Sequence, residues 1–182
     1  MERCRLVFSG SGGQGVITAA IILAEAAVIY EQLTATQAQS YGPEARGGAT
    51  RSDIIVSDSK IHYPKVIQPN VLVCLTQEAY TKFSSIVRPG GFLLVDPRFV
   101  QPHAKIDARQ ISIPMYQSVM EEIGKAIVFN ICMLGAVIGI TRLVKPASIM
   151  KVMEKRIPSS FLDMNRRALD LGLKLGESYG GL

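Results

Sequence analysis

The sequence predicts one three-layer α/β domain over residues 1–182, with a mostly parallel sheet and helices on both of its faces. Short apolar runs bounded by turn residues alternate with longer segments of helical character, which is typical of buried parallel strands joined by crossover helices. The chain has the length of one ordinary domain and contains no internal repeat or linker. Apolar residues make up 48% and charged residues 19%, which excludes a disordered chain.

Three strands and one helix are expected in the first part of the chain. Residues 5–9 form an apolar run that ends at glycines, as buried strands do. Residues 15–30 are almost continuously apolar and rich in alanine, which predicts a helix packed on most sides. A short second strand is expected at residues 33–37, followed by a loop. Alternating side chains in residues 50–57 predict a third strand.

The middle of the chain is expected to supply the central parallel strands. Residues 71–75 and 92–95 are short apolar runs, and residues 78–87 between them have the character of a crossover helix. One more strand is expected within residues 106–113. A single long helix is then expected over residues 116–140.

Two further helices are expected near the C-terminus. Pro146 suits a first helical position, and Ser160 with Asp163 resembles a capping box that opens a last helix to about residue 176. The longest apolar run, residues 126–140, is shorter than the ~20 residues that span a bilayer and contains Asn130. We therefore expect a buried helix there and no membrane association.

Charge and cysteine content narrow the possible partners. The net charge of +5 favours contact with anions, but the basic residues are dispersed, so we expect no nucleic-acid partner. Cys4, Cys74 and Cys132 are far apart, whereas an iron–sulfur cluster usually has four cysteine ligands. We therefore predict no metal site and a reducing, cytoplasmic location, with the cysteines acting as small buried apolar residues.

A glycine-rich loop joins the first predicted strand to the first helix. Its sequence, GSGGQG at residues 10–15, allows a tight turn and close approach of a ligand to the backbone. Free N–H groups at the start of the helix favour an anion. The candidate binding residues are Gly10, Gly12, Gly13, Gln14 and Gly15.

Two specific nucleotide sites fit this loop poorly. A phosphate-binding P-loop would have lysine at Val16 and serine or threonine at Ile17. A dinucleotide site would have an acidic residue at the end of the second strand, and residues 36–39 contain none. Three alternatives stay open: an anionic or polar ligand, a loop of a partner protein, or glycines that only allow the helix and strand to pack closely.

A second unusual loop follows the second predicted strand. Residues 41–48 (YGPEARGG) bring an aromatic ring, a carboxylate and a guanidinium together, so Tyr41, Glu44 and Arg46 are further candidate binding residues. Loops after parallel strands share the carboxyl edge of a sheet, so this loop is expected to face the glycine loop. A turn in which Glu44 pairs with Arg46 is the alternative.

Together the two loops resemble a known family. Residues 10–15 and 41–48, followed by SDIIVSD at 52–58 and by Tyr63-Pro64, resemble the gamma subunits of 2-oxoacid:ferredoxin oxidoreductases of the 2-oxoglutarate, ketoisovalerate or pyruvate type. The 2-oxoglutarate or branched-chain 2-ketoacid type is the best match. The resemblance covers nearly the whole chain. It implies a multi-subunit enzyme that oxidatively decarboxylates a 2-oxoacid, transfers the acyl group to coenzyme A and reduces ferredoxin.

The resemblance also implies how the work is divided. Thiamine diphosphate with its magnesium would lie between alpha and beta subunits, and beta and delta subunits would hold the iron–sulfur clusters. This chain would bind no cofactor tightly, would dock on the alpha subunit and would be inactive alone. The alternatives are a subunit of indolepyruvate oxidoreductase and a stand-alone module that binds a nucleotide or another cofactor.

Further hypotheses concern individual residues. Arg46, together with Arg51, could meet the phosphates of coenzyme A through charge-assisted hydrogen bonds. Asn130 is expected to make a local buried hydrogen bond rather than to contact a ligand. Asp96-Pro97 ends a central strand and could either line a cleft or form a turn.

Overall fold

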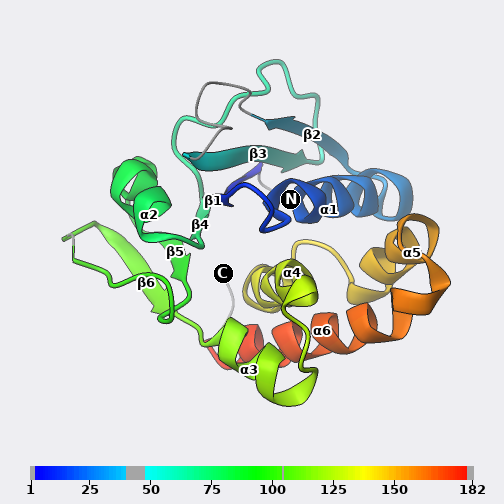
Figure 1. The fold of residues 1–182 in the computed structure, drawn as a ribbon. Helices are drawn as coiled ribbons and strands as arrows, with labels where there is room; N and C mark the ends of the chain where they lie inside the picture. Colours follow the sequence, from blue (N-terminus) through cyan, green and yellow to red (C-terminus); the bar gives the residue numbers. More distant parts are fainter. Residues whose placement is uncertain (1–2, 40–47, 104, 180–182) are drawn as a thin grey trace.

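The computed structural model describes residues 3–39, 48–103 and 105–179. A sheet of strands lies between helices, which is the predicted α/β fold (Figure 1). The strands are β1 (Cys4–Ser11), β2 (Thr34–Gln39), β3 (Ala49–Ser57), β4 (Val71–Cys74), β5 (Gly91–Val95) and β6 (Ala108–Ser112). The helices are α1 (Val16–Glu31), α2 (Gln77–Phe83), α3 (Met115–Glu122), α4 (Phe129–Thr141), α5 (Pro146–Arg156) and α6 (Ser159–Glu177), with short 3-10 turns η2 (Ser84–Ile86) and η3 (Ala126–Val128).

The six strands lie in the order β2-β3-β1-β4-β5-β6. The neighbours from β1 to β6 pair in parallel, whereas β3 is antiparallel to both β1 and β2. The connection between Gln39 and Ala49 explains this direction, because a parallel crossover needs about a dozen or more residues. The sheet is therefore mostly parallel, as the sequence predicts, with one reversed strand.

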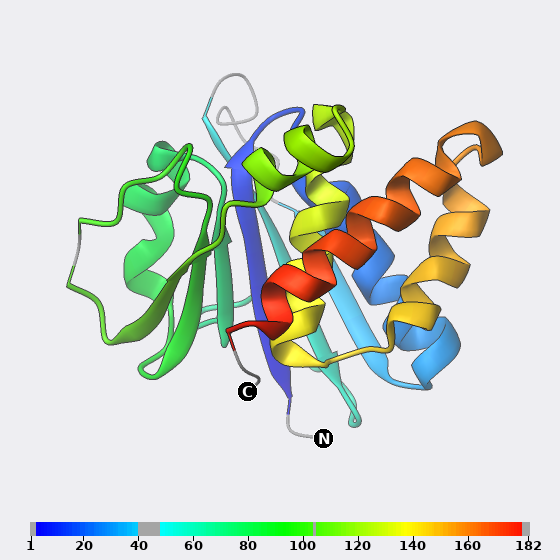
Figure 2. The same ribbon diagram turned by 90° about the horizontal axis from the view of Figure 1, so that it is seen from below.

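Alternate residues of the strands face two separate hydrophobic cores. Leu6 and Phe8 of β1 point into the core covered by α1 and α4, whereas Val7 points into the smaller core under α2. Both views show α1 and α4 on one face and α2 on the other, with α6 packed on the outside of α4 (Figures 1 and 2). Helix α4 is buried on nearly all sides because it lies between the sheet and α6.

The prediction of one long helix over residues 116–140 is wrong. The chain forms α3, the turn η3 and α4 instead. Gly124 causes the break, because it has φ = +73° and its N–H donates to the carbonyl of Val119 at 3.0 Å, as a glycine just past a helix end does. Lys125 is extended, so the following turn starts in a new direction.

The two C-terminal helices follow the prediction except at one cap. Pro146 occupies the first turn of α5 as expected. The prediction of a capping box formed by Ser160 and Asp163 is wrong, because α6 begins at Ser159 after Pro158 and has no side-chain cap. Among the described helices, none is both long and apolar enough to cross a bilayer.

Candidate functional site

The glycine loop lies where the chain changes direction in the sheet. From β1, helix α1 leads to β2 on one side, and from the adjacent β4, helix α2 leads to β5 on the other. These helices cover opposite faces (Figure 1). Parallel α/β sheets bind ligands at the carboxyl ends of the strands at such a switch point. The loop between β1 and α1 is therefore placed as a ligand-binding loop would be.

The side chain of Gln14 bridges this switch point. Its Oε1 accepts from the N–H of Ser11 at 2.7 Å, and its Nε2 donates to the carbonyl of Leu75 at 3.4 Å, just beyond β4. A Cβ on Gly10 would lie 2.4 Å from the same Oε1, so glycine there makes room for this brace. Gly10 and Gln14 thus have packing roles within the chain.

Gly15 has a packing role as well. It has φ = +73°, and a Cβ there would lie 2.5 Å from Nδ2 of Asn130. That nitrogen donates to the Gly15 carbonyl at 3.3 Å, which joins α4 to the start of α1. Asn130 therefore makes a hydrogen bond within the chain, as expected, but its partner is distant in sequence and the bond is only partly buried rather than local.

The two middle glycines face outward. Gly12 and Gly13 are exposed, and a Cβ on either would meet nothing within 4 Å. Gly13, with Gln14 and Gly15, lines a hollow of about 340 Å³ whose other walls come from residues after β5 and around α3, η3 and α4. The first N–H groups of a helix have no partner within the helix and attract anions. Open backbone and the start of α1 therefore meet beside a cavity.

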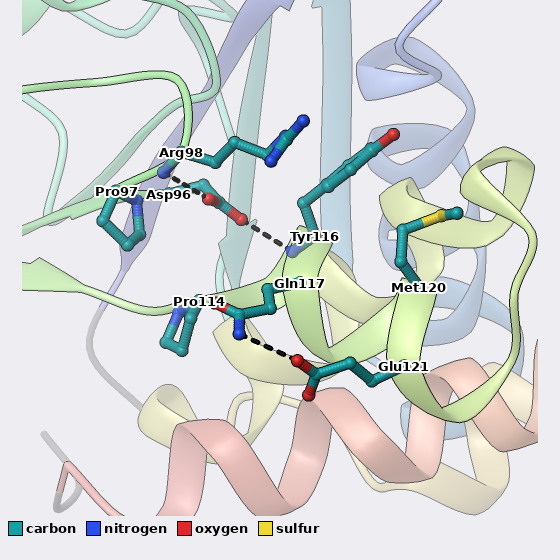
Figure 3. A pocket seen from close by; sticks show the side chains of 8 residues that line it. All are labelled: Asp96, Pro97, Arg98, Pro114, Tyr116, Gln117, Met120 and Glu121. Atoms are coloured by element: carbon teal, nitrogen blue, oxygen red, sulfur yellow. Dashed lines mark hydrogen bonds between the residues drawn. The ribbon is translucent and has the colours of Figure 1, made fainter.

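The next polar group along this edge is Asp96, directly after β5. Its carboxylate is fully buried and accepts from the N–H of Arg98 at 2.9 Å and from the N–H of Tyr116 at 2.7 Å (Figure 3). It thereby caps the first turn of α3 from a different element. Asp96 also lines a cleft, so both interpretations of Asp96-Pro97, a turn and a cleft wall, are correct.

This cleft is the second hollow of the edge, with a volume of about 690 Å³. Arg98, Tyr116, Gln117 and Glu121 supply its polar and aromatic groups (Figure 3). Tyr116 also lines the hollow beside the glycine loop, so one ring borders both cavities. The carboxyl edge therefore offers two adjoining cavities, one with open backbone and one with a cationic and aromatic wall.

Burial raises the pKa of Asp96 above its ordinary value, although its hydrogen bonds to Tyr116 and Arg98 oppose this shift. An acid with a raised folded-state pKa binds protons more readily when folded, so its contribution to stability declines as the pH rises through the raised pKa. We expect the wild type to lose free energy of unfolding relative to Asp96→Asn when the pH is raised from 3.5 to 7. Urea unfolding at both pH values measures this. An unchanged difference would contradict the predicted shift.

Arg51 was expected to meet an anion beside the glycine loop, and this is wrong. Its guanidinium pairs with Asp53 at 2.6 Å, donates to the Val66 carbonyl and packs over Phe83 on the α2 face of the sheet. Tyr41, Glu44 and Arg46 lie outside the described residues, although Gln39 and Ala49 at the two ends of their segment lie at the carboxyl edge.

The described residues offer no metal centre. No group of three or more potential ligands from histidine, cysteine, aspartate or glutamate occurs among them. The cysteines lie in β1, β4 and α4 and are all buried. Burial raises the pKa of Cys4 to about 11 and that of Cys74 and Cys132 to about 12, so they stay protonated. They do not fit the ligand set of an iron–sulfur cluster.

The sequence did not single out Arg98, Tyr116, Gln117 or Glu121 as site residues. Asp96-Pro97 at the end of a central strand was the available signal for this part of the edge. The other residues of the cleft were not recognised because the sequence predicted one continuous helix from residue 116, whereas the chain turns at Gly124 and forms the separate helix α3.

The fold and this edge define an α/β domain with a ligand-binding arrangement at its switch point, and comparison with known proteins assigns it to a family. The sequence pattern of the family described as pyruvate ferredoxin/flavodoxin oxidoreductase matches residues 5–175. The chain is 41% identical to 2-oxoglutarate synthase subunit KorC of Methanocaldococcus jannaschii, over 96% of this chain and 95% of that one. The chain therefore belongs to the pyruvate ferredoxin/flavodoxin oxidoreductase family, which confirms the resemblance seen in its two loops.

Solved structures agree with this assignment. The gamma subunit of a keto/oxoacid ferredoxin oxidoreductase from Geobacter sulfurreducens superposes with a TM-score of 0.87 at 38% identity, covering 96% of this chain and 99% of that one. A 2-oxoglutarate:ferredoxin oxidoreductase from Magnetococcus marinus, solved with 2-oxoglutarate, coenzyme A and succinyl-CoA bound, shares the fold at 21% identity and a TM-score of 0.87. The superposition covers 98% of this chain but 32% of that longer protein.

Proposed function

We propose that this chain is the gamma subunit of a multi-subunit oxidoreductase that converts 2-oxoglutarate, coenzyme A and oxidised ferredoxin to succinyl-CoA, carbon dioxide and reduced ferredoxin. The end-to-end match with a protein named as a 2-oxoglutarate synthase subunit carries this proposal. In this assignment the alpha, beta and delta subunits hold thiamine diphosphate, magnesium and the iron–sulfur clusters. The gamma chain docks on the alpha subunit and is inactive alone.

Within that complex, the carboxyl edge of the gamma chain meets the anionic groups of coenzyme A. The open backbone at Gly12 and Gly13 and the start of α1 supply N–H donors and the positive end of a helix dipole. Arg46 adds a guanidinium that can hold a phosphate through two hydrogen bonds. The bound coenzyme A of the Magnetococcus marinus enzyme supports this choice of ligand.

Co-expression with and without the other three subunits tests the assignment. We expect 2-oxoglutarate-dependent reduction of ferredoxin from the purified complex and none from the gamma chain alone. Turnover by the isolated chain, or full activity of a complex that lacks it, would refute the subunit role. Tight binding of a nucleotide by the chain alone would favour the stand-alone module instead.

Gly12→Val tests the ligand edge. A Cβ at Gly12 meets nothing within 4 Å, so the fold should persist while a branched side chain covers the open backbone. Loss of one charge-assisted hydrogen bond, worth about 1.5–3 kcal/mol, should raise the KM for coenzyme A on the order of tenfold or more. Arg46→Ala should act in the same direction. Unchanged KM values for both variants would exclude coenzyme A from this edge.

A further inference from the structure

The sheet has two edge strands, β2 and β6, and the chain itself protects β6. The exposed Arg109 of β6 donates from its guanidinium to the carbonyl of Tyr179 at 2.8 Å. The hydroxyl of Tyr179 donates in turn to the carbonyl of Ser112 at 3.0 Å. A charged side chain and a covering segment are common means by which proteins keep an edge strand from pairing with another chain.

Strand β2, at the opposite edge, has neither kind of protection. Its six residues, Thr34–Gln39, include no charged residue and no proline. Among the described residues β2 pairs with β3 alone, so the backbone N–H and C=O groups that point away from β3 have no strand to pair with. An uncharged edge of this kind is a template for a further strand.

An apolar stripe of helix α1 runs beside this edge. Helix α1 packs on β2 and β3 at this end of the sheet (Figure 1). Ile17, Ile21, Ala24 and Val28 share one face of the helix, where the first three are partly exposed and Val28 is 47% exposed. Ile17 and Ala24 lie at the margin of the core that Ala35 of β2 also reaches. Strand β2 and this stripe form one uncharged surface, which we term the β2 edge surface.

We propose that the β2 edge surface pairs with the same surface of a second copy of this chain. A twofold axis perpendicular to the sheet, at Thr36 or Gln37, pairs the two β2 strands antiparallel and places both apolar stripes on one face. Hydrogen-bonding groups then meet hydrogen-bonding groups, and apolar side chains meet apolar side chains. The two sheets become one continuous sheet.

The charges around the surface favour a second copy as the occupant. A twofold axis brings identical groups together, and neither β2 nor the stripe contains a charge that would repel its copy. The two carboxylates of α1 are held within the chain. Glu25 pairs with Arg156, whereas Glu31 accepts from the Ser148 hydroxyl and from the N–H of Lys145. A different partner is usually selected through complementary charges, which this surface does not offer.

The contact also has the size of a specific interface. An axis at Thr36 or Gln37 pairs about five residues of each strand, which gives about four to six backbone hydrogen bonds. A typical protein interface has about 5–15 direct hydrogen bonds. The strands alone therefore reach the lower part of this range, and the two stripes add apolar contact around Val28.

Cysteine cross-linking tests the axis directly. Residues directly opposite each other in an antiparallel pair have Cα atoms about 4.5–5.5 Å apart, which a disulfide can span. A residue on the axis lies opposite its own copy, so Thr36→Cys or Gln37→Cys should link two copies after mild oxidation. We expect this link both in the full chain alone and in the purified multi-subunit complex. The native cysteines of the chain are buried and should not take part.

Thr34→Cys is the matched control for cross-linking. This residue is exposed and lies on the same strand, but its two copies would be more than about 10 Å apart. It should therefore form no link. The proposal is overturned if neither Thr36→Cys nor Gln37→Cys links two copies, or if Thr34→Cys links them equally well. A link from residue 36 or 37 to a different subunit would also overturn it, because another chain would then cover the edge.

Val28→Lys tests the stripe. Two lysines would meet in an apolar contact, so the dissociation constant of the dimer, measured by sedimentation of the full chain, should rise at least about tenfold. Ile29→Lys is the matched control, because Ile29 is 54% exposed and points about 100° away around the helix. It should change the constant less than about twofold. Equal effects of the two lysines, or a wild-type chain that stays monomeric, would contradict the pairing, whereas the gamma-subunit assignment is tested separately by ferredoxin reduction.

Discussion

Gly172→Ala should destabilise the protein more than an alanine at Gly12, Gly13 or Gly15. Helices α4 and α6 approach each other through two glycines on each, namely Gly135, Gly139, Gly172 and Gly176. A Cβ on Gly172 would lie 2.0 Å from the backbone oxygen of Cys132. Neither atom belongs to a flexible side chain, so the two helices would have to move apart.

The size of the effect follows from two opposing contributions. Alanine in place of glycine in a helix normally stabilises by about 1 kcal/mol. Overpacking a closely packed interior costs about 1–3 kcal/mol and occasionally more. Here we expect a cost of about 4 kcal/mol, because only a movement of the two helix backbones can relieve the contact and this opens the packing that covers α4. We expect a net loss of about 3 kcal/mol, which is a fall of roughly 6–12 °C in Tm for a chain of this size.

Thermal and urea unfolding of the isolated chain measure this loss. Gly12→Ala is the matched control, because its Cβ meets nothing within 4 Å, and its Tm should stay within about 2 °C of wild type. A Tm for Gly172→Ala equal to or above that of wild type would show that α4 and α6 are not in this close contact.

Gly15→Ala should have the second largest effect, and it links the fold to the ligand edge. Its φ of +73° costs an alanine about 1–2 kcal/mol. The new Cβ would also lie 2.5 Å from Nδ2 of Asn130. Asn130 would have to give up its hydrogen bond to the Gly15 carbonyl, so we expect a total loss of at least about 2 kcal/mol and weaker binding of coenzyme A.

Gly13→Ala separates the two causes. Gly13 has φ = +86°, but a Cβ there meets nothing within 4 Å, so this variant shares the backbone strain without the clash. We therefore expect Gly13→Ala to be less destabilised than Gly15→Ala in urea unfolding. Adding Asn130→Ala to Gly15→Ala should cost less than the sum of the two single losses, because neighbouring groups couple. Equal stability of the two glycine variants would exclude the clash with Asn130.

The order of strands and helices was largely readable from the sequence because apolar runs and turn residues carry it locally. The strands predicted at residues 50–57, 71–75 and 92–95 lie close to the positions of β3, β4 and β5 in the structure. The break at Gly124 was missed because a lone glycine in a segment of helical character looks the same whether it packs inside a helix, as Gly135 does, or ends one. The positive φ of Gly124 and the hydrogen bond from its N–H to Val119 distinguish the two, and both are features of the tertiary structure.

The glycine loop was found by its spacing, but its members differ in role. Gly10 and Gly15 leave room for Gln14 and Asn130, whereas Gly12 and Gly13 leave open backbone. The sequence allowed both packing and ligand binding for the whole loop, and the structure assigns the packing role to particular positions. Arg51 was grouped with the candidate site because it lies close in sequence to the second loop. The structure shows that its side chain lies on the α2 face of the sheet, where it pairs with Asp53.

The sequence by itself determined the α/β class, the position of the glycine loop and the family, because these depend on residue types at short spacing. The tertiary structure alone decided which groups stand together at the carboxyl edge. Asp96 accepts a hydrogen bond from the first turn of α3, 20 residues later in the sequence, and Asn130 donates to Gly15, 115 residues earlier. Such contacts depend on how β5, α3 and α4 pack, and no local pattern of residues records that packing.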